Sequence, residues 1–147
     1  MEPRDPGFKD RVKASFQKQL VMGTIGARLT RIDPGAVDIT MSFRGDLGQQ
    51  HGYLHAGIVS TILDSACGYA AMSLNELDTA VLAVEFKVNF VAPAVGDDIV
   101  ARGRVVKPGR TLTICTGEAY ARTGGEEKLV AVIQSTIMNV RGRSITD

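Results

Sequence analysis

One stretch of the sequence concentrates the residues that could do chemistry. It holds both histidines of the chain, His51 and His55, and one carboxylate, Asp64, in the run HGYLHAGIVSTILDSACGYAA. A carboxylate in apolar surroundings costs free energy unless it is paired or hydrogen-bonded, and desolvation raises its pKa toward the range of a general base. We therefore predict that Asp64 acts as a base. The alternative is a structural carboxylate satisfied by Ser60, Thr61 or a group from elsewhere in the chain.

The helix that we predict for residues 56–75 has a second reactive feature at its start. Backbone N–H groups in a first turn lack intrahelical acceptors, so those of Ala56 and Gly57 are suited to bind a carbonyl or oxyanion. Asp64 lies roughly 12 Å further along, at ~1.5 Å per residue. A reacting atom must lie about 3 Å from both groups, which one helix cannot achieve. If the two groups act together, Asp64 of one subunit must therefore meet the helix N-terminus of another. We expect a homodimer with antiparallel helices.

One face of this predicted helix carries mostly small side chains at steps of three and four. The face consists of Gly57, Ser60, Thr61, Asp64, Cys67, Gly68 and Ala71. Small side chains let another group approach the helix backbone closely. We expect this face to be a subunit interface, a ligand cleft, or both.

Further elements must position these groups, and the first of them precede the long helix. Asp5 followed by Pro6 is typical of a helix N-terminus. Apolar residues then recur every four positions, at Phe8, Val12, Phe16 and Leu20. Past Gly23 the apolar period approaches two, which predicts a hairpin of TIGARLTRI and AVDITMSF around a turn at Asp33-Pro34-Gly35.

Four strands are predicted after the long helix, as VLAVEFKVNFV, IVARGRVVK, TLTICTGEAYA and KLVAVIQSTIMNV. The short connections favour antiparallel neighbours in consecutive hairpins. The long helix has few charges around its circumference, so we expect a curved antiparallel sheet to wrap it in an α+β fold. We expect one domain over residues 1–147, with an N-terminal helix in 1–21, a core in 22–140 and a tail in 141–147.

The composition excludes several classes of protein. Hydrophobic residues make up 44% of the 147 residues and charged residues 22%, with a net charge of +1, as in ordinary folded domains. No basic stripe suggests a nucleic-acid partner. No run approaches the ~18 apolar residues of a membrane span, and the N-terminus lacks the apolar core of a signal peptide, so we expect a cytoplasmic protein. We expect Cys67 and Cys115 to be reduced thiols.

The motif G-x-x-H-A-G, followed by VSTILDSACGYAA and then AVEFKVNFVAPAVGDDIVARGRVVKPGRTL, resembles the hotdog-fold acyl-CoA thioesterases of the PaaI-like, phenylacetate-pathway branch. The similarity runs from about Met22 to about Val140. It implies a hotdog fold and hydrolysis of a small, medium or aryl acyl-CoA. It also implies a homodimer or a dimer of dimers, with no metal and no cofactor, since coenzyme A is part of the substrate.

The resemblance also implies roles for site residues. Asp64, nine positions after His55, takes the place of the general base or nucleophile. The amide of Ala56, with Gly57 nearby, would polarise the thioester carbonyl, and the carboxamide of Gln49 would assist. We expect His55 to order the loop by hydrogen bonding.

Three positions depart from the family pattern. Ala56 stands where glycine is usual, Gln49 where asparagine is common, and Ala83 where some relatives have serine. The resemblance further implies that the coenzyme A phosphates lie near Lys107 and Arg110, whose cationic groups suit phosphate. The alternative is that these two are ordinary solvated turn residues.

Several rival functions remain to be weighed. A metal site at His51 and His55 would lack a third ligand nearby in sequence, and Cys67 lies in a helix interior where nothing lowers a thiol pKa. A hydratase or dehydratase would need its own acid–base pair at the acyl chain, and we find none. A non-catalytic acyl-CoA-binding or sensing module stays open: Ala56 and Ala83 favour it, and Asp64 opposes it.

Overall fold

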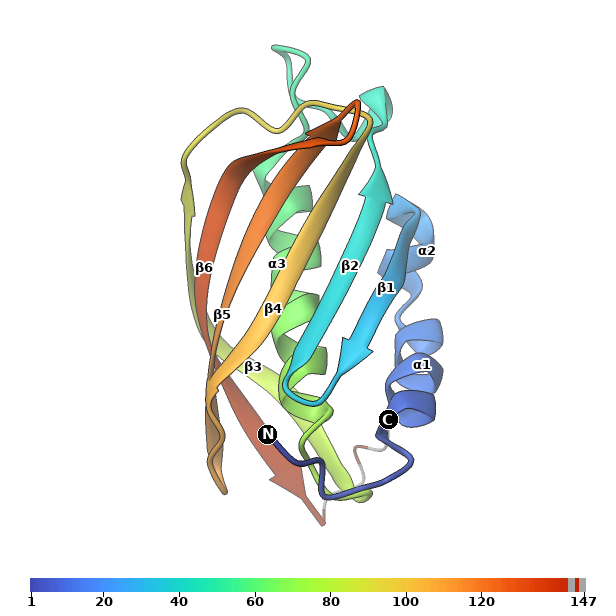
Figure 1. The fold of residues 1–147 in the computed structure, drawn as a ribbon, viewed down its shortest axis with the longest axis vertical. Helices are drawn as coiled ribbons and strands as arrows, with labels where there is room; N and C mark the ends of the chain where they lie inside the picture. Colours follow the sequence, from blue (N-terminus) through green and yellow to red (C-terminus); the bar gives the residue numbers. More distant parts are fainter. Residues whose placement is uncertain (143–144, 146–147) are drawn as a thin grey trace.

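In the computed structural model, which describes residues 1–142 and 145, an antiparallel sheet curves around one long helix (Figure 1). The predicted α+β architecture is therefore confirmed. The elements are α1 (Phe8–Lys18), α2 (Leu20–Ile25), β1 (Ala27–Asp33), β2 (Ala36–Ser42), the 3₁₀ helix η1 (Gly45–Leu47), α3 (Ala56–Met72), β3 (Thr79–Phe90), β4 (Asp98–Lys107), β5 (Leu112–Thr123) and β6 (Glu126–Arg141).

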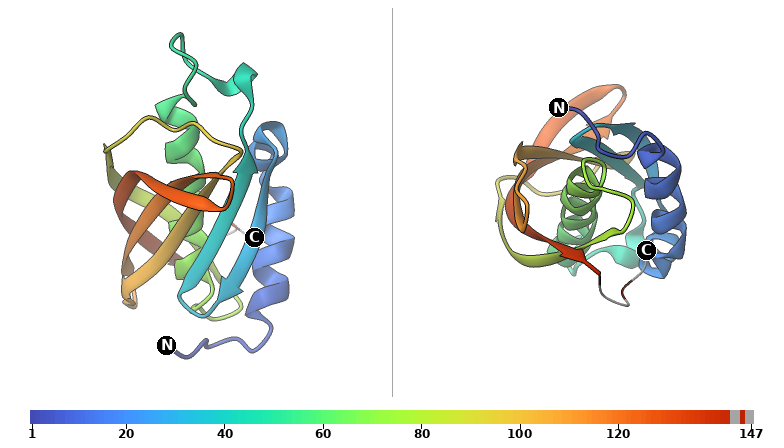
Figure 2. Two further views of the ribbon diagram at one scale, coloured as in Figure 1. Left: turned by 45° about the horizontal axis from the view of Figure 1, so that its top comes forward. Right: turned by 90° about the horizontal axis from the view of Figure 1, so that it is seen from below.

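The core lies between α3 and the concave face of the sheet, which surrounds the helix when the molecule is seen along its axis (Figure 2). Ile62 and Leu63 of α3 are fully buried, as are Ile39 of β2 and Ile99 of β4. A Cβ on Gly103 would lie 2.3 Å from the carbonyl carbon of Ala66, so only glycine lets β4 approach α3 this closely. Burial on most sides explains why α3 shows little polar periodicity.

Two residues of the predicted small face belong to the core instead. Cys67 is fully buried and Ala71 is 1% exposed. Steps of three and four cover a wide arc of the helix, and Cys67 falls on the part of that arc that faces β5, close to Gly117. Gly57, Thr61, Asp64 and Gly68 are the members that stay at least partly exposed along one line of α3, together with Ser60.

The strands lie in the order β1-β2-β4-β5-β6-β3. β3 pairs with β6 and not with β4, so the prediction of consecutive hairpins is wrong for β3 and β4. Residues 91–97 instead cross from one edge of the sheet toward its middle (Figure 1). A crossover of this length has the same local composition as a hairpin loop, so the sequence alone does not distinguish them. β3 is consequently an edge strand.

The N-terminal segment also differs from its prediction. The helix begins at Phe8, and the carboxylate of Asp5 accepts a hydrogen bond from the amide of Gly7 at 2.8 Å ahead of it. α1 ends before Gln19, so Leu20 starts α2 and is 82% exposed, outside the predicted apolar repeat. α2 ends at Ile25 and is capped by Gly26, whose φ of 71° favours glycine.

The predicted tail, residues 141–147, begins at the last residue of β6. Its residues 143–144 and 146–147 lie outside the described part of the chain. Within the described part, no helix has both the length and the apolar character needed to cross a membrane.

Candidate active site

Asp64 lies on the partly exposed line of α3, near the middle of the helix. Its Oδ1 is buried and has no hydrogen-bond partner among the described residues. Burial raises the pKa of this carboxyl group above its ordinary value, because desolvation disfavours the charged form. Ser60 and Thr61 do not satisfy the Asp64 carboxylate. Their hydroxyls donate instead to the carbonyls of Ala56 and Gly57.

The carboxylate lines a cavity of about 350 Å³, which we call the Asp64 cavity. α1 and the residue after it contribute polar side chains, and β3 and β6 contribute mainly apolar ones. These lining residues include Ser15, Lys18, Gln19, Val81, Leu82 and Ile137. The cavity is therefore lined by both polar and apolar groups, and its wall includes a carboxylate with an unpartnered buried oxygen.

The first turn of α3 has one amide without an acceptor. Gly57 donates to Nδ1 of His55 at 2.9 Å, and Ile58 and Val59 donate to the carbonyl of His55 at 2.9 and 3.3 Å. In the described part of the chain, the amide of Ala56 alone in this turn has no hydrogen-bond acceptor. His55 thus caps the start of α3, and Ala56 has the amide left to bind a ligand.

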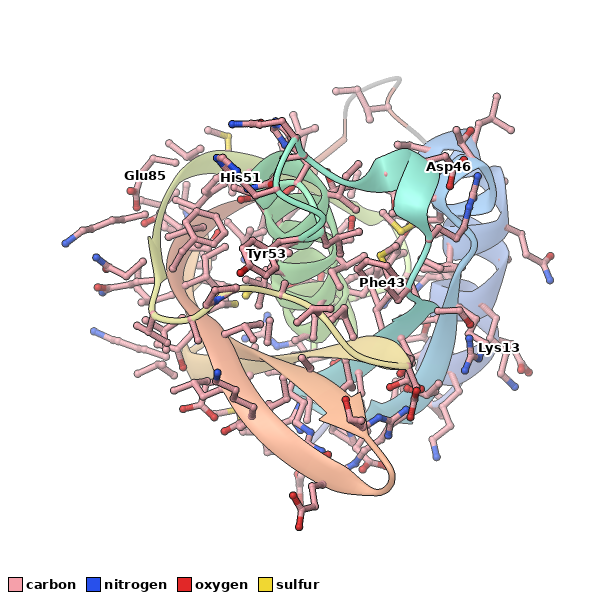
Figure 3. All side chains as sticks on the ribbon, turned by 90° about the horizontal axis from the view of Figure 1, so that it is seen from above. Lys13, Phe43, Asp46, His51, Tyr53 and Glu85 are labelled. Atoms are coloured by element: carbon pink, nitrogen blue, oxygen red, sulfur yellow. The ribbon has the colours of Figure 1, made fainter. Side chains whose placement is uncertain are left out.

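Gln49 lies beside Ala56 in the wall of a second cavity, of about 430 Å³, which we call the Ala56 cavity. Its side-chain oxygen accepts a hydrogen bond from the amide of His51, which leaves its NH₂ group as a donor. Tyr53 and Phe90 also line this cavity. Figure 3 shows His51 and Tyr53 on the loop above the start of α3.

One chain does not bring the two halves of the predicted site together. Asp64 lines the first cavity, whereas Ala56 and Gln49 line the second. Both cavities reach β3: Leu82 lines the Asp64 cavity and Phe90 the Ala56 cavity. A site that uses all three groups needs a neighbour to bring one half to the other.

The edge strand β3 exposes large apolar side chains. Leu82 is 45% exposed, Val84 51%, Phe86 45% and Phe90 48%. An apolar surface of this strand is thus largely uncovered within one chain. Exposed apolar residues on an edge strand favour association with another protein surface.

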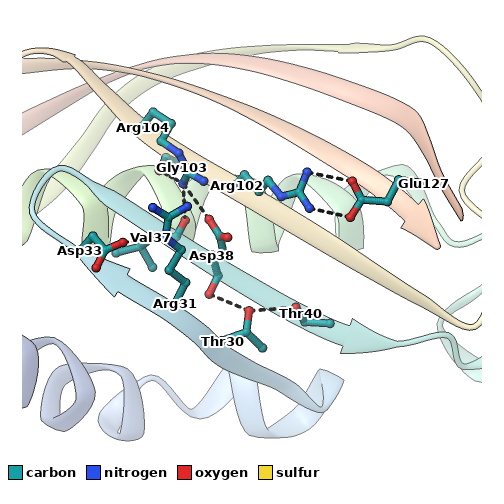
Figure 4. Close-up of polar contacts among 10 residues, drawn as sticks. All are labelled: Thr30, Arg31, Asp33, Val37, Asp38, Thr40, Arg102, Gly103, Arg104 and Glu127. Atoms are coloured by element: carbon teal, nitrogen blue, oxygen red, sulfur yellow. Dashed lines mark hydrogen bonds and ion pairs between the residues drawn. The ribbon is translucent and has the colours of Figure 1, made fainter. Parts of the chain in front are cut away.

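The outer face of the sheet has a different character (Figure 4). Arg104 on β4 lies 2.7 Å from the carboxylate of Asp38 on β2. Arg102, also on β4, makes two hydrogen bonds to Glu127 near the start of β6. These pairs keep the convex surface polar, so the apolar surface of β3 is a local feature and not a property of the whole sheet.

Lys107 and Arg110 lie at the turn between β4 and β5, and both are exposed. This turn is far from the start of α3, because Asn139 donates to the carbonyl of Gly109 at 2.8 Å and accepts from Asn75, which follows the other end of the helix. Within one chain, the structure therefore does not join Lys107 and Arg110 to the Ala56 cavity.

Sequence reasoning missed the residues that α1 and its end bring to the Asp64 cavity. Ser15, Lys18 and Gln19 lie more than forty positions before Asp64, and no local pattern links them to it. It also missed Ser65, whose hydroxyl contacts Gln19 at 3.3 Å. No local signal marks Gln19 in the sequence, because the apolar repeat continues to Leu20 and the break between α1 and α2 appears only in the structure.

Comparison with known proteins gives several matches. The thioesterase superfamily profile matches residues 51–128, over half of the chain. A thioesterase family protein from Silicibacter pomeroyi has a crystal structure that is 54% identical, with a TM-score of 0.91, over 92% of this chain and 100% of that one. Human acyl-coenzyme A thioesterase 13 is 29% identical over 112 residues, which are 76% of each chain.

The PaaI protein of E. coli, from the phenylacetic acid degradation operon, supports the fold. It has a TM-score of 0.83 at 20% identity, over 92% of this chain and 94% of that one. This likeness confirms the hotdog arrangement of sheet and helix. From the family match and the close relative, the chain belongs to the thioesterase superfamily and is a thioester hydrolase with the hotdog fold.

Proposed function

We propose that this protein hydrolyses an acyl-CoA to the free acid and coenzyme A at a site shared between two subunits. The observation that carries the proposal is Asp64: a carboxylate with an unpartnered buried oxygen, in the wall of a cavity, on a thioesterase fold. Burial raises the pKa of this carboxyl group, which makes its carboxylate a stronger base toward an attacking water.

The chemistry follows from the available groups. The amide of Ala56 and the NH₂ group of Gln49 would donate hydrogen bonds to the carbonyl oxygen and stabilise the negative charge that develops there. Asp64 of the facing subunit would remove a proton from water, whose oxygen attacks the carbonyl carbon. The C–S bond then breaks, and the thiolate of coenzyme A leaves and takes up a proton. Direct attack by Asp64, followed by hydrolysis of the anhydride, is the second route open to the same groups.

The dimer in this proposal forms through β3. A second copy that adds its own β3 antiparallel to this strand would cover Val84, Phe86 and Phe90 and would continue the sheet. It would also bring the Ala56 cavity of one subunit toward the Asp64 cavity of the other, since both reach β3. Lys107 and Arg110 remain candidates for contacts with the coenzyme A phosphates in this assembly.

The first test measures thiol release from short, medium, long and aryl acyl-CoAs. We expect the wild type to hydrolyse at least one of them and Asp64→Asn to lose about a hundredfold or more in kcat, in line with the loss of a general base. A wild type that binds acyl-CoA tightly and releases no thiol would instead support the non-catalytic binding module.

A second test asks whether the site is shared. Ala56→Pro replaces the free amide hydrogen by a ring carbon, and proline is well tolerated at the first helical position. Asp64→Asn and Ala56→Pro should each be inactive as homodimers. Heterodimers of the two would hold one intact site, so a re-equilibrated equal mixture should regain about a quarter of the wild-type activity. A site within one chain would give no recovery.

A further inference from the structure

Helix α1 and the residue after it, Gln19, form one wall of the Asp64 cavity. Gln19 is the residue between the two N-terminal helices, where α1 has ended and α2 has not begun. Its side-chain oxygen accepts a hydrogen bond from the hydroxyl of Ser65 at 3.3 Å, and Ser65 directly follows Asp64. The break between the helices therefore places an amide side chain in the wall of the cavity that Asp64 also lines.

Arg11, on the same helix α1, anchors the other end of this wall. Its guanidinium lies 3.1 Å from the carboxylate of Asp5, and both side chains are only about a tenth exposed. The same group donates to the carbonyls of Met72, Asn75 and Glu76 at 3.1, 2.8 and 2.9 Å. Carbonyls at the end of a helix lack intrahelical partners, so a buried guanidinium satisfies them and opposes the negative end of the helix dipole.

Apolar contacts hold α1 between these two points. Phe8 and Val12 are buried, at 7% and 0% exposure. The ring of Phe16 lies 5.7 Å, between centroids, from that of Tyr69, which itself lines the Asp64 cavity. The wall is thus fixed at both ends and along its length.

We propose that the wall made by α1 and Gln19 determines which acyl groups the protein accepts, with Gln19 as the specificity-determining residue and Arg11 as the positioning residue. This inference rests on the proposed thioesterase function. An acyl-CoA whose carbonyl carbon faces Asp64 has its acyl group in this cavity. The opposite walls belong to β3 and β6, whose pairing constrains them, so the helical wall is where one side chain can change the depth of the cavity.

The experiment compares kcat/KM for butyryl-, hexanoyl-, octanoyl- and decanoyl-CoA. Gln19→Ala should raise the decanoyl-to-butyryl ratio by about tenfold or more, since each added methylene that a pocket accepts is worth about tenfold or more. Gln19→Met, which refills the space without the hydrogen bond, should keep the wild-type ratio. Arg11→Ala should shift the ratio in the same direction, through KM more than through kcat.

Lys13→Ala is the matched control, because Lys13 lies on the same helix but lines a separate hollow against β1. It should leave the ratio unchanged. An unchanged ratio in folded Gln19→Ala, or an equal loss on all substrates, would overturn the proposal. Should Arg11→Ala fail to fold, Gln19→Ala and Gln19→Met decide the matter by themselves.

The failure of the proposed function has a different signature. In that case the wild type releases no thiol from any of the four substrates. The affinities of the corresponding non-hydrolysable thioether analogues, measured by calorimetry, then decide the selectivity proposal. A chain-length preference that Gln19→Ala changes and Gln19→Met preserves supports it, and a preference that both variants leave unchanged overturns it.

Discussion

The amide of Gly57 donates a hydrogen bond to Nδ1 of His55, 2.9 Å away, so the imidazole caps the start of α3. A ring nitrogen that accepts a hydrogen bond carries no proton, so the proton of the neutral ring lies on Nε2. A Cβ on Gly57 would lie 3.1 Å from the same Nδ1, so glycine leaves room for the ring. Because the cap uses the Gly57 amide, the Ala56 amide is the one that stays available.

His55→Ala should lower the free energy of unfolding by about 1 kcal/mol, the usual cost of a lost N-cap. His55→Asn should retain most of the stability, because asparagine is a preferred N-cap residue. Urea denaturation of the three proteins at one concentration measures the difference. Equal losses in both variants would show that the imidazole contributes by packing and not as a cap.

Asp64→Asn should be more stable than the wild type at pH 7 as well as inactive. The folded state raises the pKa of Asp64, so it binds a proton more tightly than the unfolded chain does. Stability from this group is therefore lost as the pH rises from the ordinary carboxyl value of 3.8 through the raised pKa. The gain in the free energy of unfolding from Asp64→Asn, measured across this pH range, should shrink toward low pH.

Asp46 is the control for this pH effect. It is exposed, and its hydrogen bonds with Arg44 lower its pKa, which is the opposite direction. Asp46→Asn should therefore bring no gain in stability at pH 7. A gain of the same size in both variants would mean that a general reduction of negative charge, and not the burial of Asp64, is responsible.

Gly103→Ala should destabilise the fold by about 1–3 kcal/mol or more, because its methyl group would meet backbone atoms of α3 that cannot rotate away. Gly68→Ala is the comparison within the helix. No atom lies within 4 Å of a Cβ at Gly68, so alanine there should stabilise α3 by up to about 1 kcal/mol. Thermal unfolding that ranks Gly103→Ala as the milder change would contradict the close approach of β4 to α3.

Phe86→Asp should split the proposed dimer, because it places a charge on the exposed edge strand β3. Analytical ultracentrifugation should show a smaller species, and activity should fall even though Asp64 is intact. Thr116→Asp, at an exposed position of the interior strand β5, should leave the assembly unchanged. A wild type that sediments as a monomer would contradict the shared site.

Local patterns predicted the parts of the fold that depend on one face of one element. The alternation of Val37, Ile39 and Met41 predicted a strand with a buried face, and all three side chains are fully buried. The run around Asp64 predicted a wrapped helix, which α3 is. Its C-terminal end lies at Met72, three residues before the predicted end.

Contacts between distant residues were not predictable in this way. Arg11 contacts carbonyls more than sixty positions away, and nothing in α1 distinguishes it from the other basic residues of that helix. The pairing of β3 with β6 likewise depends on how the sheet closes around α3. At the candidate site, sequence placed Asp64 and Ala56 on one helix, but the cavities that separate them arise from α1, β3 and residues 91–94, which only the folded chain brings near.

The pairing of β3 with the last strand also orders events during synthesis. α3 and β3 leave the ribosome well before β6, which is the strand that joins β3 to the rest of the sheet. Until β6 is made, the apolar helix has no complete cover and β3 has no partner within its own chain. Because such distant pairing is slow and leaves apolar surface open, the nascent chain is most exposed to aggregation in the interval before β6 is made.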